Sequence, residues 1–194
     1  MVINSPIHFQ LDTADPKQVL WHAIRKFVNK EPKGLPAYAE VAKWLGDNQG
    51  RGLICVGQSS LGKSVICCQV LPYIFSQYFG DAGIEVKVMT ATEMNQHIDE
   101  LLDFCGYKHV IIIDDLGKES PETVTFGNRR RPFFELVDKC EVTGTLLIIT
   151  TNLRTTEHPT IKHPSIEGQY GVPTLERLKA ITHVVKFEGE SMRG

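Results

Sequence analysis

Strand-like and helix-like patterns alternate along this chain beyond residue 50. Runs rich in β-branched and other apolar residues, which predict buried parallel strands, occupy residues 53–56, 84–89, 110–113, 145–150 and 183–187. Apolar residues at helical spacing lie between these runs, at residues 65–71, 93–104, 132–140 and 175–181. This alternation predicts an α/β fold with a parallel sheet and right-handed crossovers. Pro72 is expected to kink the first of these helices or to lie near its end.

The N-terminal part has a different pattern. Residues 1–14 are mixed in character and are expected to be extended or poorly ordered. Two helical patterns follow at residues 15–27 and 38–46, separated by a break that contains Pro and Gly. They are too short to fold alone, so we divide the chain into an N-terminal helical extension, residues 1–50, and one α/β domain, residues 51–194.

A phosphate-binding loop follows the apolar run at 53–56 directly. Residues 57–64 read G-Q-S-S-L-G-K-S, a complete G-x-x-x-x-G-K-S pattern between a strand and a helix. In such a loop backbone N–H groups point at phosphates, Lys63 reaches them as a point charge, and the Ser64 hydroxyl binds Mg²⁺. We therefore expect ATP and Mg²⁺ as cofactors. The predicted nucleotide-binding residues of this segment are Gly57, Gln58, Ser59, Ser60, Leu61, Gly62, Lys63, Ser64 and Val65.

Two adjacent carboxylates follow the strand pattern at 110–113. Taken alone, such a pair is more often a strand that leads into a turn, but a phosphate-binding loop upstream gives it chemical meaning. We expect Asp114 to hold Mg²⁺ together with Ser64, and Asp115 to orient and deprotonate the attacking water. Glu119 is the alternative base, less well placed because it lies farther along the loop.

A third polar position follows the strand pattern at 145–150. Asn152 comes after two threonines, at the end of a strand that is expected beside the Asp114 strand. Its amide can hydrogen-bond the attacking water or the γ-phosphate and thus sense hydrolysis. The alternative is an ordinary turn, in which Asn is common.

The motifs together resemble those of one protein family. The segments concerned are G-L-I-C-V-G, I-I-D-D-L-G-K-E, F-G-N, I-I-T-T-N-L, Y-G-x-x-x-x-E-R-L and G-E-S-M-R. They occur in the order seen in AAA+ ATPases similar to the helicase loader DnaC and the transposition helper IstB. The resemblance covers roughly residues 50–193.

This resemblance implies a five-stranded parallel sheet in the order 5-1-4-3-2, with helices on both faces and a lid that is reduced or absent. It also implies that Asn152 is the polar sensor, Arg177 the arginine finger and Arg193 a second sensor near the γ-phosphate. From its helical position alone, Arg177 would more often be a surface charge. The chain departs from the family in its loop, where Gln-Ser-Ser-Leu replaces a stretch that usually has a further Gly.

The overall charge excludes a strongly basic nucleic-acid binder. The net charge is −2 and the isoelectric point is near 6.4, so a surface for single-stranded DNA would have to be local. The candidate is Arg129-Arg130-Arg131 followed by Phe133 and Phe134, although these phenylalanines are more simply the core face of a helix and the arginines could also contact another protomer.

The remaining composition indicates a cytoplasmic protein without a membrane role. The five cysteines show no metal-binding or disulfide spacing, which favours reduced, buried thiols. No apolar run approaches the length of a membrane span.

The sequence therefore predicts an AAA+ ATPase domain that binds ATP and Mg²⁺, hydrolyses ATP slowly and assembles into a homo-oligomer. Its expected task is in DNA replication or transposition, with single-stranded DNA and a replicative helicase or a transposase as possible partners. Two alternatives stay open: a nucleotide-dependent binding module with negligible turnover, and a P-loop small-molecule kinase, for which the chain has no Arg-rich lid segment.

Overall fold

A parallel sheet of five strands forms the centre of the structure, a computed structural model that describes residues 6–11, 15–28, 34–125, 127–158 and 163–189. Its strands are β1 (Gly52–Gly57), β2 (Glu85–Thr90), β3 (His109–Leu116), β6 (Leu146–Thr151) and β7 (Thr182–Phe187). Their spatial order is β7-β1-β6-β3-β2, and all four pairings are parallel. Counted along the chain within this sheet, the order is 5-1-4-3-2, so the expected topology is confirmed.

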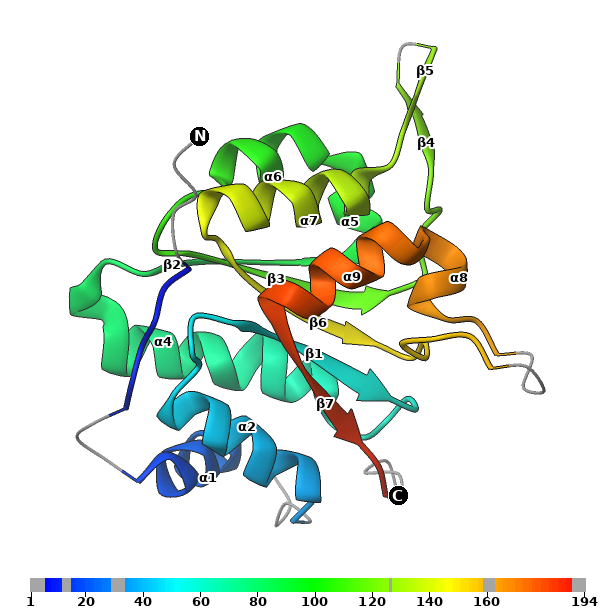
Figure 1. The fold of residues 1–194 in the computed structure, drawn as a ribbon. Helices are drawn as coiled ribbons and strands as arrows, with labels where there is room; N and C mark the ends of the chain where they lie inside the picture. The colour runs from blue at the N-terminus through cyan, green and yellow to red at the C-terminus, as the bar shows by residue number, and fades with distance from the viewer. Residues whose placement is uncertain (1–5, 12–14, 29–33, 126, 159–162, 190–194) are drawn as a thin grey trace.

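Helices cover both faces of the sheet (Figure 1). The first face carries α1 (Pro16–Phe27), α2 (Pro36–Gly46), α3 (Lys63–Val65), the π-helix η1 (Ile66–Val70), α4 (Leu71–Phe79) and the short 3-10 helix η2 (Gly80–Ala82). The second face carries α5 (Ala91–Gln96), α6 (Ile98–Phe104), α7 (Pro132–Thr143), α8 (Ile166–Tyr170) and α9 (Val172–Ile181). Successive side chains of β3 alternate between the two resulting cores, as the pleat requires.

The N-terminal segment shares the core of the first face. Ile7, Phe9 and Leu11 are buried at alternate positions of an extended stretch, together with the inner sides of α1 and α2. The fully buried Asn48 fixes this stretch, because its side chain accepts from the Phe9 N–H at 2.9 Å and donates to the Ile7 carbonyl at 2.8 Å. The described part of residues 1–50 is thus packed onto the sheet, while its functional separation from residues 51–194 stays a prediction.

The helix after the phosphate-binding loop continues past Pro72, so the expected end of the helix near this residue is wrong. Residues 63–79 are helical throughout, and Pro72 is the second residue of α4. Proline removes one backbone donor and crowds the preceding turn. The wider π turn at Ile66–Val70 lies directly before α4, which is where this crowding occurs.

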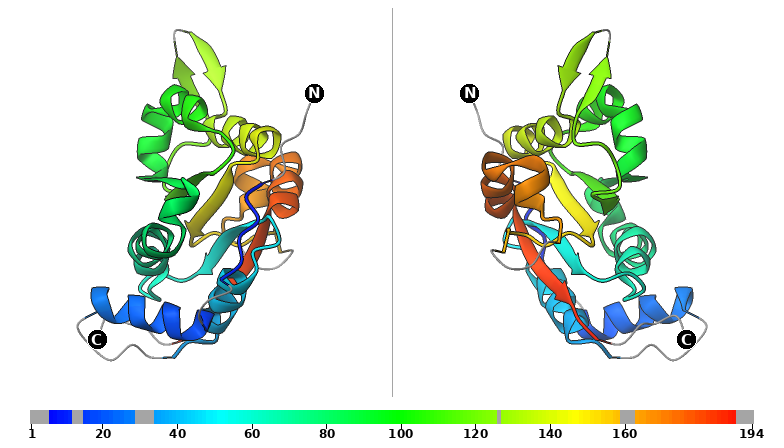
Figure 2. Two further views of the ribbon diagram at one scale, coloured as in Figure 1. Left: turned by 90° about the vertical axis from the view of Figure 1, so that its left-hand side faces the viewer. Right: turned by 90° about the vertical axis from the view of Figure 1, so that its right-hand side faces the viewer.

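Three features were missed by the hydrophobic pattern. A hairpin of β4 (Thr123–Thr125) and β5 (Asn128–Arg130) forms a separate two-stranded sheet that projects away from the body (Figure 2). The helix expected over 93–104 is interrupted at His97 and divided into α5 and α6. The short helix α8 was not expected, because it is held mainly by the capping of Ser165 and by packing. None of the described helices is long and apolar enough to span a membrane.

Candidate nucleotide-binding site

The phosphate-binding loop connects β1 to α3 at the carboxyl edge of the sheet. Gly57 and Gly62 have φ values of 157° and 82°, which favour glycine. A Cβ atom on Gly57 would lie 2.2 Å from the Phe187 carbonyl oxygen of β7. The first glycine of the motif is therefore required by the close approach of the neighbouring strand, and the second by the turn into the helix.

Lys63 joins this loop to the end of β6. Its Nζ donates to the carbonyl oxygens of Gly57 and Gln58, each at 2.7 Å, and to Asn152 Oδ1 at 3.0 Å. The side chain is almost completely buried. Burial lowers the pKa of Lys63, and the charges of Asp115 and then Asp114 partly oppose this shift. The predicted phosphate ligand is thus a desolvated cation, held by loop carbonyls and facing two carboxylates.

The predicted metal ligands Ser64 and Asp114 meet across the site. Ser64 Oγ donates to Asp114 Oδ1 at 2.8 Å, and the Thr150 hydroxyl also donates to Asp114 Oδ1. Mg²⁺ is usually held by one or two protein oxygens, with waters and substrate phosphates completing its shell, so this pair fits the ion. Among the described residues, no three His, Cys, Asp or Glu side chains gather to hold a metal by themselves.

Asp115 lies on a bulge at the end of β3. The register between β3 and β6 shifts after Ile113, and Asp115 takes a φ of 58° while its N–H donates to Thr150 Oγ1 at 2.9 Å. Bulges turn side chains away from the regular pleat. The Asp115 carboxylate is about one third exposed and pairs with Lys118 Nζ at 2.5 Å. The bulge therefore separates the two carboxylates, leaving one at Ser64 and the other, partly exposed, at Lys118.

Glu119, the alternative base, has a structural environment. It is buried, accepts from the Gly117 N–H at 2.9 Å and accepts from the Tyr170 hydroxyl. Burial and then this carboxylate raise the pKa of Tyr170 well above its ordinary value. The acceptor positions of Glu119 are thus used to hold the loop against α8.

Asn152 connects the end of β6 to two parts of the loop. Its Oδ1 accepts from Lys63 Nζ, as described above, and its Nδ2 donates to Ser59 Oγ at 3.1 Å. A plain turn would not require these contacts. The structure brings Asn152 to the phosphate-binding loop, and its role as a sensor stays a prediction.

Sequence reasoning missed Thr150 and Cys68. Thr150 is fully buried and links β6 to β3, because its hydroxyl donates to the Asp114 carboxylate and accepts from the backbone N–H of Asp115. Cys68 lies one turn after Ser64, where burial and then Asp114 raise its pKa to about 12, so it is a neutral thiol beside the candidate metal site. A threonine at the end of the strand beside the Asp-Asp pair was a usable signal for the first, whereas nothing in the pattern pointed to Cys68. All five cysteines are free thiols.

The two arginines implied by family resemblance lie apart from these contacts or outside the description. Arg177 is on α9 and pairs with Asp138 and with Glu141 at 3.1 Å, both on α7. It shares this surface with the ring of Phe134, 5.6 Å from its guanidinium carbon. Arg193 lies outside the described residues.

The arginine triplet does not act as one patch. Arg129 is highly exposed, with Glu122 at 3.9 Å, whereas Arg130 binds Asp99 at 2.8 Å and Glu135 at 2.6 Å. Arg131 donates to the Tyr170 carbonyl and stacks on Phe134. Two of the three side chains therefore anchor the base of the β4–β5 hairpin to the body of the protein, and Phe133 is buried as a core residue should be.

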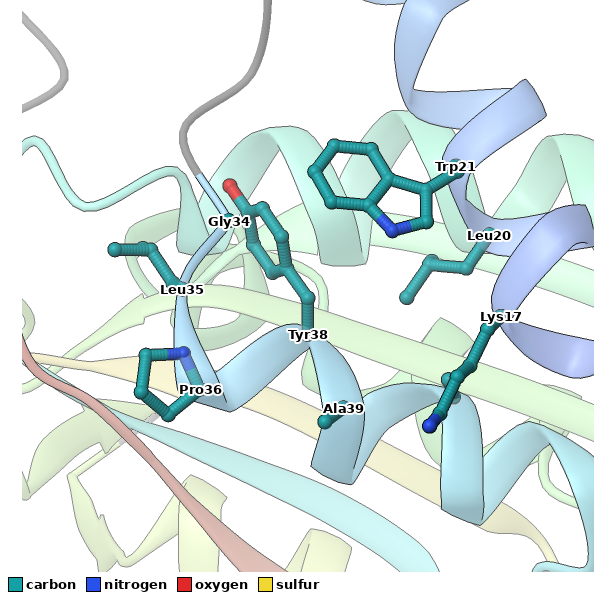
Figure 3. A pocket seen from close by; sticks show the side chains of 9 residues that line it. Lys17, Leu20, Trp21, Gly34, Leu35, Pro36, Tyr38 and Ala39 are labelled. Atoms are coloured by element: carbon teal, nitrogen blue, oxygen red, sulfur yellow. The ribbon is translucent and has the colours of Figure 1, made fainter.

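A pocket lies between the N-terminal helices α1 and α2, apart from the phosphate-binding loop (Figure 3). It has a volume of about 370 Å³ and lies between Leu20 and Trp21 of α1 and the first turns of α2. Tyr38 closes one side, and its ring contacts the ring of Phe187 with centroids 6.2 Å apart. Its walls offer ring faces and one ammonium group, that of Lys17, so phosphate chemistry belongs to the loop rather than to this groove.

Comparisons with known proteins agree on the fold. No family model matches the chain, and a search of curated proteins by sequence gives no match. The crystal structure of the DnaC helicase loader matches with a TM-score of 0.59 at 16% identity, over 87% of this chain and 98% of that one. The crystal structure of DnaI matches at 0.52 and 16% identity, over 95% and 88% of the two chains. The structure of AMPPCP-bound DnaA from Aquifex aeolicus matches with a TM-score of 0.51 at 18% identity, over 88% of this chain and 51% of that chain. The fold is that of P-loop AAA+ proteins.

We predict that Lys63→Met stabilises the protein at neutral pH, because it removes a buried charge and keeps an apolar side chain of similar length. The pKa of Lys63 is lower in the folded protein than in the unfolded chain, so the unfolded chain binds this proton more tightly than the folded protein does. The free energy of unfolding of the wild type should therefore increase as pH rises from the lowered folded pKa toward the ordinary value of about 10.4. Urea unfolding between pH 7 and pH 10 tests this, with the exposed Lys118→Met as control. A less stable Met variant at pH 7 would show that the carbonyl contacts outweigh desolvation.

Arg130→Ala should lower the free energy of unfolding by about 1–3 kcal/mol, because the hydrogen bonds of this half-buried guanidinium to Asp99 and Glu135 are lost. Arg129→Ala, which removes an exposed side chain, should change it by less than about 0.5 kcal/mol. Equal effects in urea titrations of the two variants would mean that the hairpin is not anchored through Arg130.

Proposed function

We propose that this chain, an α/β protein with the P-loop AAA+ fold, binds ATP with Mg²⁺ and hydrolyses it. The observation that carries the proposal is the convergence of three strand ends on one loop, through the contacts of Lys63 with Asn152 and of Ser64 with Asp114. Each of these residue types has a defined role in phosphoryl transfer, and each lies where the carboxyl ends of β1, β3 and β6 meet.

We assign each residue of the site a role that follows from the chemistry of its side chain. Lys63 exchanges its loop carbonyls for the β- and γ-phosphates, and Ser64 with Asp114 would hold Mg²⁺, which when bound offsets phosphate charge. Asp115 accepts the proton of the attacking water, while Asn152 orients the water or the terminal phosphate. Asp115 is partly exposed whereas Glu119 is buried and bound by Tyr170, and this difference supports the choice of Asp115 as the base.

The biological task we propose is that of a helper ATPase in DNA replication or transposition that acts as a homo-oligomer. The motif resemblance and the likeness of the fold to DnaI and to the DnaC helicase loader support it. Arg177, held on an outer helix by Asp138 and Glu141, is our candidate for an arginine that reaches the nucleotide of a neighbouring subunit. Arg193 remains the candidate second sensor.

A nucleotide-dependent binding module with negligible turnover is the alternative, and turnover separates it from the ATPase. Lys63→Ala should abolish ATP binding because the loop loses its charge beside the phosphates, whereas Asp115→Asn should bind ATP and hydrolyse it about 10²-fold more slowly. Titration calorimetry and phosphate release measure the two steps. Full activity in Asp115→Asn together with loss in Glu119→Gln would move the base to Glu119, and a wild type without turnover would favour the binding module.

Arg177→Ala should leave ATP binding intact but remove the rise of specific activity with protein concentration. Mixed with Lys63→Ala chains, which still offer Arg177, the variant should regain part of its activity because a neighbouring subunit then supplies the missing arginine. An arginine finger can raise the rate of hydrolysis by about 10³-fold. Lys179→Ala, an exposed cation on the same helix, is the matched control. If specific activity depends neither on protein concentration nor on mixing, Arg177 does not act on the nucleotide of a neighbouring subunit.

A further inference from the structure

A small cavity lies beside the phosphate-binding loop, at the ends of β1 and β7. It has a volume of about 300 Å³ and is bounded by Gly57 of the loop, by the end of β7 and by the residues that follow β6. Val56, Val184 and Phe187 supply its apolar wall. Of the residues that line it, Gly57 is the one that also belongs to the predicted nucleotide-binding loop.

Arg154 lines this cavity with a partly buried side chain. Its Nη1 atom is buried, and the guanidinium forms no hydrogen bond or ion pair with any residue that the structure describes. By contrast, Arg130, Arg131 and Arg177 are each bound by carboxylates or carbonyls. A buried guanidinium nitrogen without an acceptor is costly, so an anion that reaches Nη1 explains this position best.

The backbone of Arg154 is fixed rather than mobile. Its N–H donates to the Pro164 carbonyl at 3.2 Å, and its carbonyl accepts from the Ile166 N–H at 2.7 Å, next to a bridge with Ser165. Arg154 lies two residues after Asn152, which contacts Lys63. The backbone from which this side chain extends is thus held in a set position relative to the phosphate-binding loop.

The other polar groups of the cavity also favour an anion. Lys186 of β7, which lies beside Val56 in the strand register, adds a second cation, and Thr155 and Thr156 add hydroxyl donors. Glu188 is the acidic residue of the lining. Two cations and two hydroxyls against one carboxylate leave a net positive site, and the planar guanidinium is suited to two-point contact with an oxyanion.

We propose that Arg154 and Lys186 form a phosphate-binding subsite next to the nucleotide loop. The phosphate can come from two sources: the terminal phosphate of a nucleotide bound in the loop, in which case the subsite rests on the proposed function, or a phosphodiester of single-stranded nucleic acid. Both present the same oxyanion chemistry to the same two cations.

Arg154→Gln tests the subsite, with Lys43→Gln as a control that removes an exposed cation of α2. If the terminal phosphate is the ligand, Arg154→Gln weakens binding of the analogue AMPPCP at least about tenfold and leaves ADP unchanged. If a phosphodiester is the ligand, nucleotide binding is unchanged, while affinity for a single-stranded oligonucleotide falls and its salt slope drops by about one. If Arg154→Gln and Lys43→Gln bind both ligands equally well, the proposal is overturned.

Lys186→Gln removes an exposed side chain and provides the same test should Arg154→Gln fold poorly. Inorganic pyrophosphate added to the wild type provides a readout that does not depend on nucleotide binding: the side-chain NMR signal of Arg154 should shift and that of Arg129 should not. A wild type that binds no nucleotide yet shows this shift would refute the proposed function and keep the subsite. An Arg154 signal unaffected by pyrophosphate and by oligonucleotide would refute the subsite alone.

Discussion

The parallel pairing of β6 with both β1 and β3 is the constraint on which the site depends. It places the carboxyl ends of three strands side by side, so that residues far apart in the chain come within hydrogen-bonding distance. The Thr150 hydroxyl, the Asn152 amide and the Ser64 hydroxyl then link the strand ends directly. A change of register at β6 would move all of these contacts together, because side chains of a strand alternate between its faces.

The site is organised around charges that are costly to bury. Lys63 is desolvated, and its pKa is lowered even though two carboxylates face it. The cost is partly offset by the loop carbonyls, which accept hydrogen bonds from the ammonium group at the place where we propose that it binds phosphate. Arg154 is more exposed than Lys63, but its Nη1 atom is buried without an acceptor. Buried cations near one loop are the expected mark of a site that recognises anions.

Most of the residues around the site stabilise the fold rather than contact the phosphate-binding loop. Residues 6–11, α1 and α2 complete the core under the first face of the sheet, and Tyr38 extends this core to Phe187 at the edge of the loop. On the second face, Tyr170 and Glu119 hold the segment after β3 against α8. The β4–β5 hairpin lies outside both cores and is attached by Arg130 and Arg131, so it presents Arg129 and the exposed Val124 to solvent.

The sequence by itself determined the strand and helix alternation, the loop at 57–64 and the residues Lys63, Ser64, Asp114 and Asn152, because strand period and phosphate chemistry are local properties of the chain. The strand order came from the family resemblance. Only the tertiary structure decided which contacts surround that loop. It placed the bulge that separates Asp114 from Asp115, and the Thr150 hydrogen bond that links β6 to β3. It also decided that Glu119 binds Tyr170, that Arg130 binds Glu135, and that Nη1 of Arg154 is buried without an acceptor. These depend on contacts between distant segments, and neither hydrophobic period nor motif spacing carries information about which polar groups such contacts satisfy.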